Sequence, residues 1–156
     1  LQKVYRNTKN ILRYIKKVGY SVDIPEGIEE GSQVKEVIAK DQVEEIKFIQ
    51  DLLAEKDFST VGILSKSTED ISEHIKVFAD DKRIHAITMS EAQGVEFDIV
   101  FIVGMNRKLF DMKYHQDMPE SFLREKQKIN KDLLYVALTR AISELYILGD
   151  SKGLSV

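Results

Sequence analysis

The feature that most constrains the fold is a run of consecutive apolar residues, Ile-Val-Phe-Ile-Val, at positions 99–103. A strand with one face in water would alternate apolar and polar residues, so an uninterrupted run indicates a strand that is covered on both faces. Residues 61–64 form a second short run of the same kind. Strands covered on both faces are typical of parallel sheets with helices packed on each side.

Segments with helical periodicity separate these apolar runs. Residues 41–56 carry an apolar stripe at helical spacing, and Asp41 with Glu44 three residues later predicts a capping box at the start of a helix. Thr68 is the expected N-cap of another helix. In all, we expect helices over residues 8–18, 41–56, 68–78 and 120–141, and strands over residues 33–39, 61–64, 84–89, 98–103 and 145–148. Residues 21–31 and 105–119 are expected to be loops, the second of them mobile.

Strands alternating with helices in this way predict one open, mostly parallel α/β sheet. In such sheets, ligands bind on the loops that follow the carboxyl ends of the strands. The chain has 156 residues, which suits a single domain over residues 1–156. Because it begins with Leu1 inside a helix-like segment, we expect a piece of a longer polypeptide; a processed small protein is the alternative.

Composition excludes several classes of protein. The net charge is −3, from 23 Lys and Arg against 26 Asp and Glu, which argues against a dedicated nucleic-acid module but permits a few phosphate contacts. The absence of cysteine excludes a disulfide framework and thiolate metal sites and is consistent with a cytoplasmic protein. No apolar run approaches the roughly 20 residues of a membrane span, so we expect no membrane segment.

Three segments could bind a ligand, and the first contains Tyr5 and Arg6. The tyrosine ring could stack on a nucleotide base, and the guanidinium could pair bidentately with phosphate oxygens. The alternative is a packed tyrosine beside a solvated arginine.

The second segment, residues 87–98, places hydroxyl residues at the end of a predicted strand. Thr88 and Ser90 suit phosphate contacts, whereas a carboxylate such as Glu96 suits a ribose hydroxyl. Gly94 would allow close approach of the backbone to a ligand. The alternative is an ordinary β-turn with Gly94 in a left-handed conformation.

The third segment, residues 132–141, mixes apolar residues with one cation, Arg140, and has the pattern of a buried helix. An arginine buried there needs an anion, because burial of an unpaired charge is costly. Arg140 could be an arginine finger that reaches a γ-phosphate, or it could form a buried ion pair with an acid of its own domain.

In order along the chain, these segments resemble the second-domain motifs of superfamily 1 helicases of the UvrD/Rep type. Residues 1–8 resemble motif IV, L-x-x-N-Y-R-S-T, with Val4 in place of Asn and Asn7 in place of Ser. Residues 61–68 resemble motif IVa, with Lys66 in place of the usual arginine.

Residues 88–97 resemble motif V, T-x-H-x-x-K-G-L-E-F, in which Ser90 replaces the histidine and Gln93 replaces the lysine. Residues 134–141 closely match motif VI, L-Y-V-A-x-T-R-A, which is the most specific of these motifs. The resemblance extends over nearly the whole chain and implies a RecA-like second motor domain.

The resemblance assigns a role to each matching residue. Tyr5 would stack on adenine, and Arg6 and Arg140 would contact the γ-phosphate. Glu96 would contact the ribose, and Gly94 would let the backbone close over the nucleotide. Nucleic-acid contacts would come from Thr88, Ser90 and Lys66. From these roles we expect the two guanidinium groups at positions 6 and 140 to converge at the carboxyl edge of the sheet.

The chain has no G-x-x-x-x-G-K-S/T phosphate loop and no acidic Mg²⁺ motif after a strand. The resemblance places both in a first RecA-like domain of the same polypeptide, which would supply the remaining contacts to ATP and Mg²⁺. The expected partners are therefore that domain and single-stranded DNA. The large subdomain that UvrD/Rep enzymes insert ahead of motif V is missing, and this compact form resembles the HelD branch. Since HelD relatives act on RNA polymerase, that enzyme is an alternative partner. A degenerate motor domain that serves as a scaffold is a further alternative.

Overall fold

The computed structural model describes residues 7–105 and 119–150, so Tyr5 and Arg6 lie outside the described residues. The described strands form one sheet in the order β1-β5-β4-β2-β3, and every neighbouring pair is parallel. This confirms the predicted parallel α/β architecture. The element bounds are β1 (Lys35–Ile38), α2 (Gln42–Ala54), β2 (Val61–Ser65), β3 (Ile84–Thr88), β4 (Phe97–Met105) and β5 (Ala141–Gly149), with α1 (Lys9–Val18), η1 (Thr68–Ile71), α3 (Ser72–Val77) and α5 (Glu120–Thr139).

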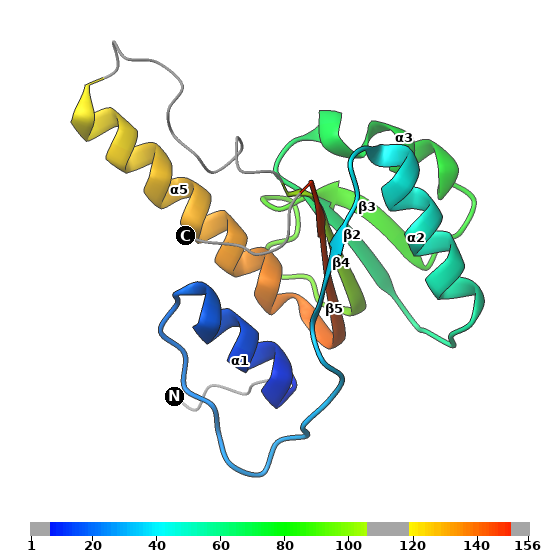
Figure 1. The fold of residues 1–156 in the computed structure, drawn as a ribbon, viewed down its shortest axis with the longest axis horizontal. Helices are drawn as coiled ribbons and strands as arrows, with labels where there is room; N and C mark the ends of the chain where they lie inside the picture. Colours follow the sequence, from blue (N-terminus) through cyan, green and yellow to red (C-terminus); the bar gives the residue numbers. More distant parts are fainter. Residues whose placement is uncertain (1–6, 106–118, 151–156) are drawn as a thin grey trace.

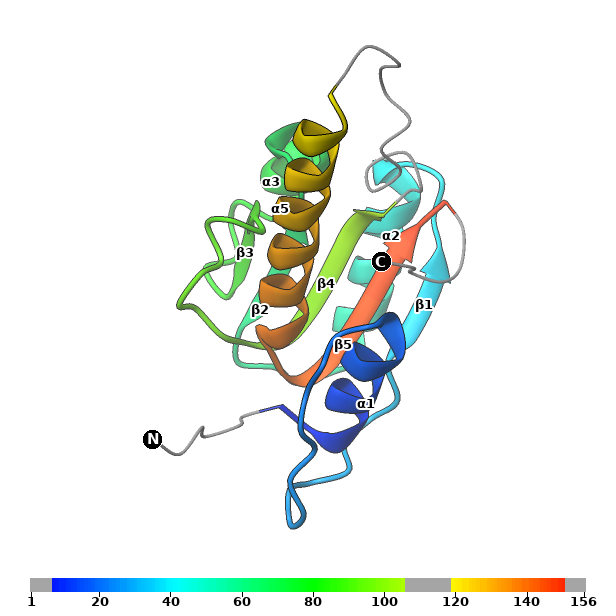
Figure 2. The same ribbon diagram turned by 90° about the vertical axis from the view of Figure 1, so that its left-hand side faces the viewer.

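The sheet lies between two layers of helices (Figures 1 and 2). On one face, α1 and α5 cover a cluster of buried side chains that includes Val100 and Ile102 of β4. On the other face, α2 covers a cluster that includes Ile99 and Phe101 of the same strand. Consecutive residues of β4 therefore contribute to opposite cores, which is why this strand is apolar without alternation.

Local capping fixes where the first two helices begin. The hydroxyl of Thr8 accepts a hydrogen bond from the amide of Ile11, and the Asp41 carboxylate accepts one from the amide of Glu44 at 2.9 Å. The Glu44 carboxylate returns to the amide of Lys40 rather than to that of the N-cap itself. The predicted capping box is thus confirmed, with its return bond displaced by one residue.

The helix predicted over residues 68–78 differs from the structure. It is divided into the short 3-10 helix η1 and the α-helix α3. The N-cap residue is Ser67 rather than the predicted Thr68. The Ser67 hydroxyl donates to the Asp70 carboxylate at 2.8 Å instead of accepting from a helix amide. A tight turn that is closed by side chains therefore replaces the first α-helical turn.

The boundary between α5 and β5 was also predicted wrongly. The helix ends at Thr139, and the strand begins at Ala141 rather than at residue 145. Pairing with β4 extends the strand, since Phe97 is in register with Ala141 and its amide donates to the Arg140 carbonyl at 2.9 Å. Polar residues at the start of β5 hid this pairing from the apolar pattern. Within the described ranges, no helix is long and apolar enough to cross a bilayer.

Candidate functional site

The residues predicted to contact ligands fall on two opposite edges of the sheet. Because the strands are parallel, residues that precede a strand lie at one edge and residues that follow a strand lie at the other. Glu96 immediately precedes β4 and Arg140 immediately precedes β5, which places both at the amino edge. Lys66 follows β2 and Thr88 ends β3, which places both at the carboxyl edge. The expectation that Arg140 lies at the carboxyl edge is therefore wrong.

Arg140 is not inside a buried helix, as its sequence context predicted, but is the half-buried residue between α5 and β5. Its Nε donates to the Val136 carbonyl at 3.2 Å, and its Nη2 donates to the Thr139 hydroxyl at 3.3 Å. Its Nη1 lies 3.5 Å from the Val95 carbonyl oxygen. Among the described residues no carboxylate forms an ion pair with it, so the alternative of a buried ion pair finds no support in that part of the chain. Within residues 7–105 and 119–150, the guanidinium is therefore oriented without being neutralised.

Asn7, which in the sequence is only a departure from motif IV, is central to this edge. Asn7 has 9% of its surface exposed, and its side-chain amide donates to the carbonyls of Thr139 at 3.0 Å and Ala141 at 2.6 Å. These carbonyls flank Arg140 on both sides. Asn7, which follows Arg6 in the sequence, thus lies directly beside the backbone on both sides of Arg140. The sequence itself offered only an asparagine just before the start of the helix predicted over residues 8–18.

Gly94 and Glu96 reach the same edge through the segment that enters β4. Gly94 has a φ of 79°, and a Cβ atom added to it would meet nothing within 4 Å. The backbone conformation at this position therefore favours glycine, as the turn alternative predicted. Crowding by neighbouring atoms is not the reason, since the space around the position is open. Glu96 is half-buried, and the next residue, Phe97, donates its amide to the Arg140 carbonyl. Glu96 and Arg140 consequently stand at the starts of neighbouring strands.

At the carboxyl edge, a carboxylate lies among the hydroxyl groups that were predicted to contact phosphates. The Thr88 hydroxyl donates to Glu91 at 2.8 Å, and the Oγ atoms of Thr88 and Ser90 are 3.3 Å apart. The Thr88 amide also donates to Glu91, and the Glu91 amide donates to the Thr88 hydroxyl. These hydrogen bonds from Thr88 lower the pKa of the Glu91 carboxyl. The T-x-x-E spacing of a capping box was the signal for this contact.

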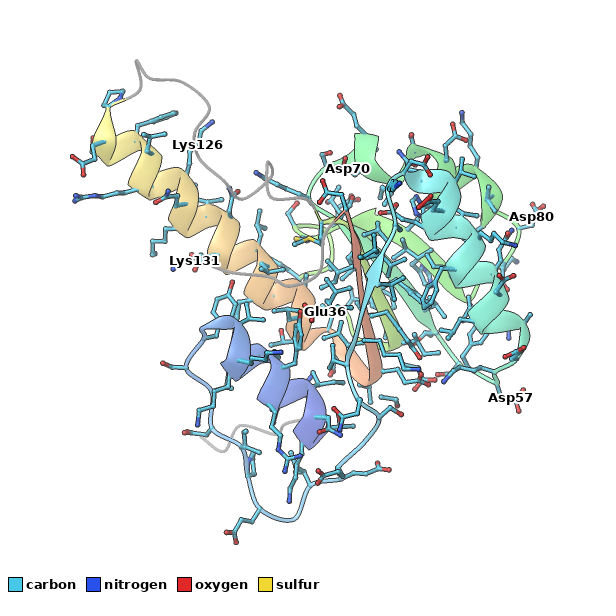
Figure 3. The ribbon with its side chains drawn as sticks, viewed as in Figure 1. Glu36, Asp57, Asp70, Asp80, Lys126 and Lys131 are labelled. Carbon is cyan, nitrogen blue, oxygen red and sulfur yellow. The ribbon has the colours of Figure 1, made fainter. Side chains whose placement is uncertain are left out.

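Lys66 is surrounded by charges from two other elements. Burial lowers the pKa of its amine, the positive charge of Lys126 on α5 lowers it further, and Asp70 of η1 opposes both effects. Figure 3 shows Lys126 on α5 and Asp70 on the opposite side of the carboxyl edge. Lys66 therefore lies where charge from both helical layers reaches the edge of the sheet. The residues within 7–105 and 119–150 contain no group of three or more side chains that could hold a metal ion.

Comparison with known proteins gives consistent matches. A sequence profile described as the UvrD-like helicase C-terminal domain matches residues 63–152. The chain is 40% identical over 68 residues to a probable DNA helicase II homologue of Mycoplasma pneumoniae, an alignment that covers 44% of this chain and 9% of the relative. It is 29% identical over 91 residues to the ATP-dependent DNA helicase PcrA of Leuconostoc citreum, covering 58% of this chain and 11% of that protein. The chain thus matches only about a tenth of the length of these relatives.

Among solved structures, the C-terminal domain of a possible DNA helicase from Lactobacillus plantarum superposes with a TM-score of 0.67. The match covers 98% of this chain and 91% of that one at 19% sequence identity. At this identity the likeness concerns the fold alone. It confirms the expected helicase-type arrangement of a parallel sheet flanked by helices.

Proposed function

The chain belongs to the family of UvrD-like helicase C-terminal domains, and from this premise we propose that it is the second motor domain of an ATP-dependent DNA helicase or translocase. In the full-length protein, ATP and Mg²⁺ would be held mainly by a first motor domain that carries the phosphate-binding loop. The domain formed by this chain would close over the nucleotide and complete the site.

The observation that carries the proposal is the environment of Arg140. Its guanidinium is anchored by backbone carbonyls and a hydroxyl at the amino edge, and no carboxylate among the described residues neutralises it. A charge oriented in this way is able to offset negative charge that develops on γ-phosphoryl oxygens during transfer. Glu96 immediately precedes the neighbouring strand β4 and would contact the ribose of the same nucleotide. Tyr5 and Arg6 would add the adenine and second phosphate contacts that motif IV implies.

The carboxyl edge supports the second part of the proposal, which is contact with single-stranded DNA through Thr88, Ser90 and Lys66. Residues 89–96 cross from this edge to the amino edge. Met89 and Ala92 anchor the crossing segment, because both are fully buried in the core beneath α1 and α5. A shift at the nucleotide edge would therefore be transmitted to the nucleic-acid edge through packed side chains.

The test is ATP turnover by the full-length protein in saturating single-stranded DNA. We expect Arg140→Ala to lower kcat on the order of 10³-fold, as loss of an arginine finger does. The kcat of Arg140→Lys should lie between those of the parent protein and Arg140→Ala, since lysine keeps the charge but lacks the planar guanidinium. Arg83→Ala is the control, because Arg83 precedes β3 at the same edge but pairs with Asp81 at 2.9 Å. Near-normal turnover by Arg140→Ala would remove the finger role.

The rival function, remodelling of RNA polymerase by a HelD-like ATPase, remains a prediction from the missing inserted subdomain and the acidic net charge. The full-length protein discriminates between the two. Strand displacement on a duplex with a single-stranded tail supports the helicase. Its absence, together with co-purification of RNA polymerase, supports the remodeller.

A further inference from the structure

We propose that Asn7 is a positioning residue that fixes the arginine finger by binding the backbone carbonyls of Thr139 and Ala141, the residues on either side of Arg140. This inference deepens the proposed function and rests on it. Asn7 itself would touch neither nucleotide nor DNA; it would act through the backbone that carries Arg140.

The geometry supports a clamp rather than a chance contact. One nitrogen, Nδ2 of Asn7, donates to the carbonyls of Thr139 at 3.0 Å and Ala141 at 2.6 Å. The Thr139 carbonyl belongs to the last turn of α5, where carbonyls have no partner within the helix. The Ala141 carbonyl belongs to the first residue of β5. Holding both carbonyls fixes the peptide plane between Thr139 and Arg140 and the plane that follows Ala141. The plane between them is held by the Phe97 amide, which donates to the Arg140 carbonyl.

The chemistry requires an amide at this position. A carboxamide nitrogen carries two N–H groups, so it is able to serve two carbonyls at once, whereas a serine hydroxyl donates only one hydrogen bond. An aspartate carboxylate would donate none at neutral pH and would face two carbonyl oxygens. The side chain is also shielded from water, since only 9% of Asn7 is exposed. Its donors therefore have no ready replacement partner if a carbonyl moves away.

The clamp also ties two parts of the proposed nucleotide site together. Asn7 follows Arg6 in the sequence and precedes Thr8, whose hydroxyl caps α1. One side chain thus connects the segment that contains the motif IV arginine to the segment that contains motif VI. The bond to Ala141 spans a sequence separation of 134 residues. Displacement of this side chain would misplace a charged group relative to the phosphate that it has to meet.

The experiment measures kcat and KM for ATP in the full-length protein for Asn7→Ser and Asn7→Asp. We expect kcat to fall by roughly tenfold to a hundredfold for Asn7→Asp, because a misplacement of about 1 Å has such an effect on a catalytic group. Asn7→Ser should lose less because it keeps one donor, and KM should change much less than kcat. Asn10→Ser is the matched control, since Asn10 lies three residues further on in the first turn of α1, is similarly buried and donates to the Gly31 carbonyl at 2.9 Å. It should lower thermal stability without lowering kcat at a temperature where the protein is folded.

Combination with Arg140→Ala separates positioning from general structural damage. If Asn7 acts through Arg140, the double variant Asn7→Ser/Arg140→Ala has the kcat of Arg140→Ala alone. Additive losses, or equal effects of Asn7→Ser and Asn10→Ser, would overturn the inference. If Arg140→Ala itself leaves turnover near normal, the proposed function fails first. If Arg140→Ala is damaged while Asn7→Ser is not, only the role of Asn7 fails.

Discussion

At the scale of the residue, local partners decide what each charged group is able to bind. Arg140 is held by carbonyl and hydroxyl oxygens, so no partner in the described part of the chain neutralises the positive charge that we propose for an anion. Thr88 is the opposite case, because its hydroxyl already donates a hydrogen bond to the Glu91 carboxylate. This pair lies at the edge where phosphate contacts are proposed. A phosphate that binds Thr88 has to displace this carboxylate, or its binding is weakened by repulsion between the two negative charges.

We therefore predict that Glu91→Gln tightens binding of single-stranded DNA by the full-length protein. The glutamine keeps a hydrogen-bonding oxygen for Thr88 but removes the negative charge, and the expected gain is roughly two- to fivefold, as for an exposed charge pair. Fluorescence anisotropy with a labelled oligonucleotide at several salt concentrations measures it, since the gain should shrink as salt rises. Glu26→Gln makes the same change of charge in the loop after α1. Equal gains in both variants would show that only net charge matters.

At the scale of the element, glycines record how closely the strands pack. A Cβ atom added to Gly62 in β2 would lie 2.5 Å from the Phe97 ring, and one added to Gly149 in β5 would collide with the backbone carbonyl of Met105. The first clash involves a buried side chain, whereas the second involves the β4–β5 ladder itself. The two positions therefore differ in whether a second substitution is able to relieve the strain.

We predict that Gly62→Ala lowers the free energy of unfolding by about 1–3 kcal/mol, as overpacking of a core does. Addition of Phe97→Leu should recover part of that loss by making room for the methyl group. Gly149→Ala should be at least as destabilising and should not be recovered by Phe97→Leu. Urea unfolding of the purified domain measures all of these. A Gly62→Ala domain as stable as the parent would show that the Phe97 ring is free to move aside.

One contact between the segment that follows α1 and helix α5 is made by a tyrosine. The Tyr20 hydroxyl donates to the Lys131 carbonyl at 2.5 Å, and its ring lies 5.1 Å from that of Tyr135. Figure 3 shows Lys131 on the part of α5 beside α1. Burial raises the pKa of Tyr20 to about 12, and the charge of Asp132 adds to this. The neutral phenol is thus the form that the folded protein retains.

This pKa predicts how stability changes in alkali. An unfolded tyrosine ionises near pH 10 and the folded one near 12, so the contribution of Tyr20 is fully present below about pH 10 and is lost as the pH rises toward 12. Tyr20→Phe removes this contribution along with the hydrogen bond. The urea midpoint should therefore fall less steeply between about pH 10 and 12 in Tyr20→Phe than in the parent domain. Parallel slopes would contradict the assignment. Tyr14 and Tyr146, whose pKa values are also raised, leave a residual slope in both proteins.

At the scale of the whole molecule, the two edges of one sheet carry the two proposed functions. Arg140 and Glu96 stand at the amino edge, Lys66 and Thr88 stand at the carboxyl edge, and a buried crossing segment joins them. A domain built in this way has its own core on both faces of the sheet. It has no phosphate-binding loop within its sequence.

We accordingly predict that the 156-residue chain alone unfolds cooperatively but does not hydrolyse ATP. Circular dichroism during thermal unfolding tests the first statement, and phosphate release with single-stranded DNA present tests the second. Mixing with a separately purified first motor domain should restore turnover, and Arg140→Ala should abolish that gain. Turnover by the isolated chain would contradict the composite site.

The sequence by itself determined the alternation of strands and helices and the parallel sheet, because apolar runs and amphipathic stripes depend on neighbouring residues. It also singled out Arg140, Glu96 and Thr88 through local motifs. It did not determine which edge each residue occupies, where β5 begins, or which groups hold Arg140. Only the tertiary structure decided these, because they depend on β4–β5 pairing, on the approach of the Val95 carbonyl to Arg140, and on the Asn7 bonds, which join residues 132 and 134 positions apart. Such contacts leave no periodic signal in the chain, since either partner alone looks like an ordinary polar residue.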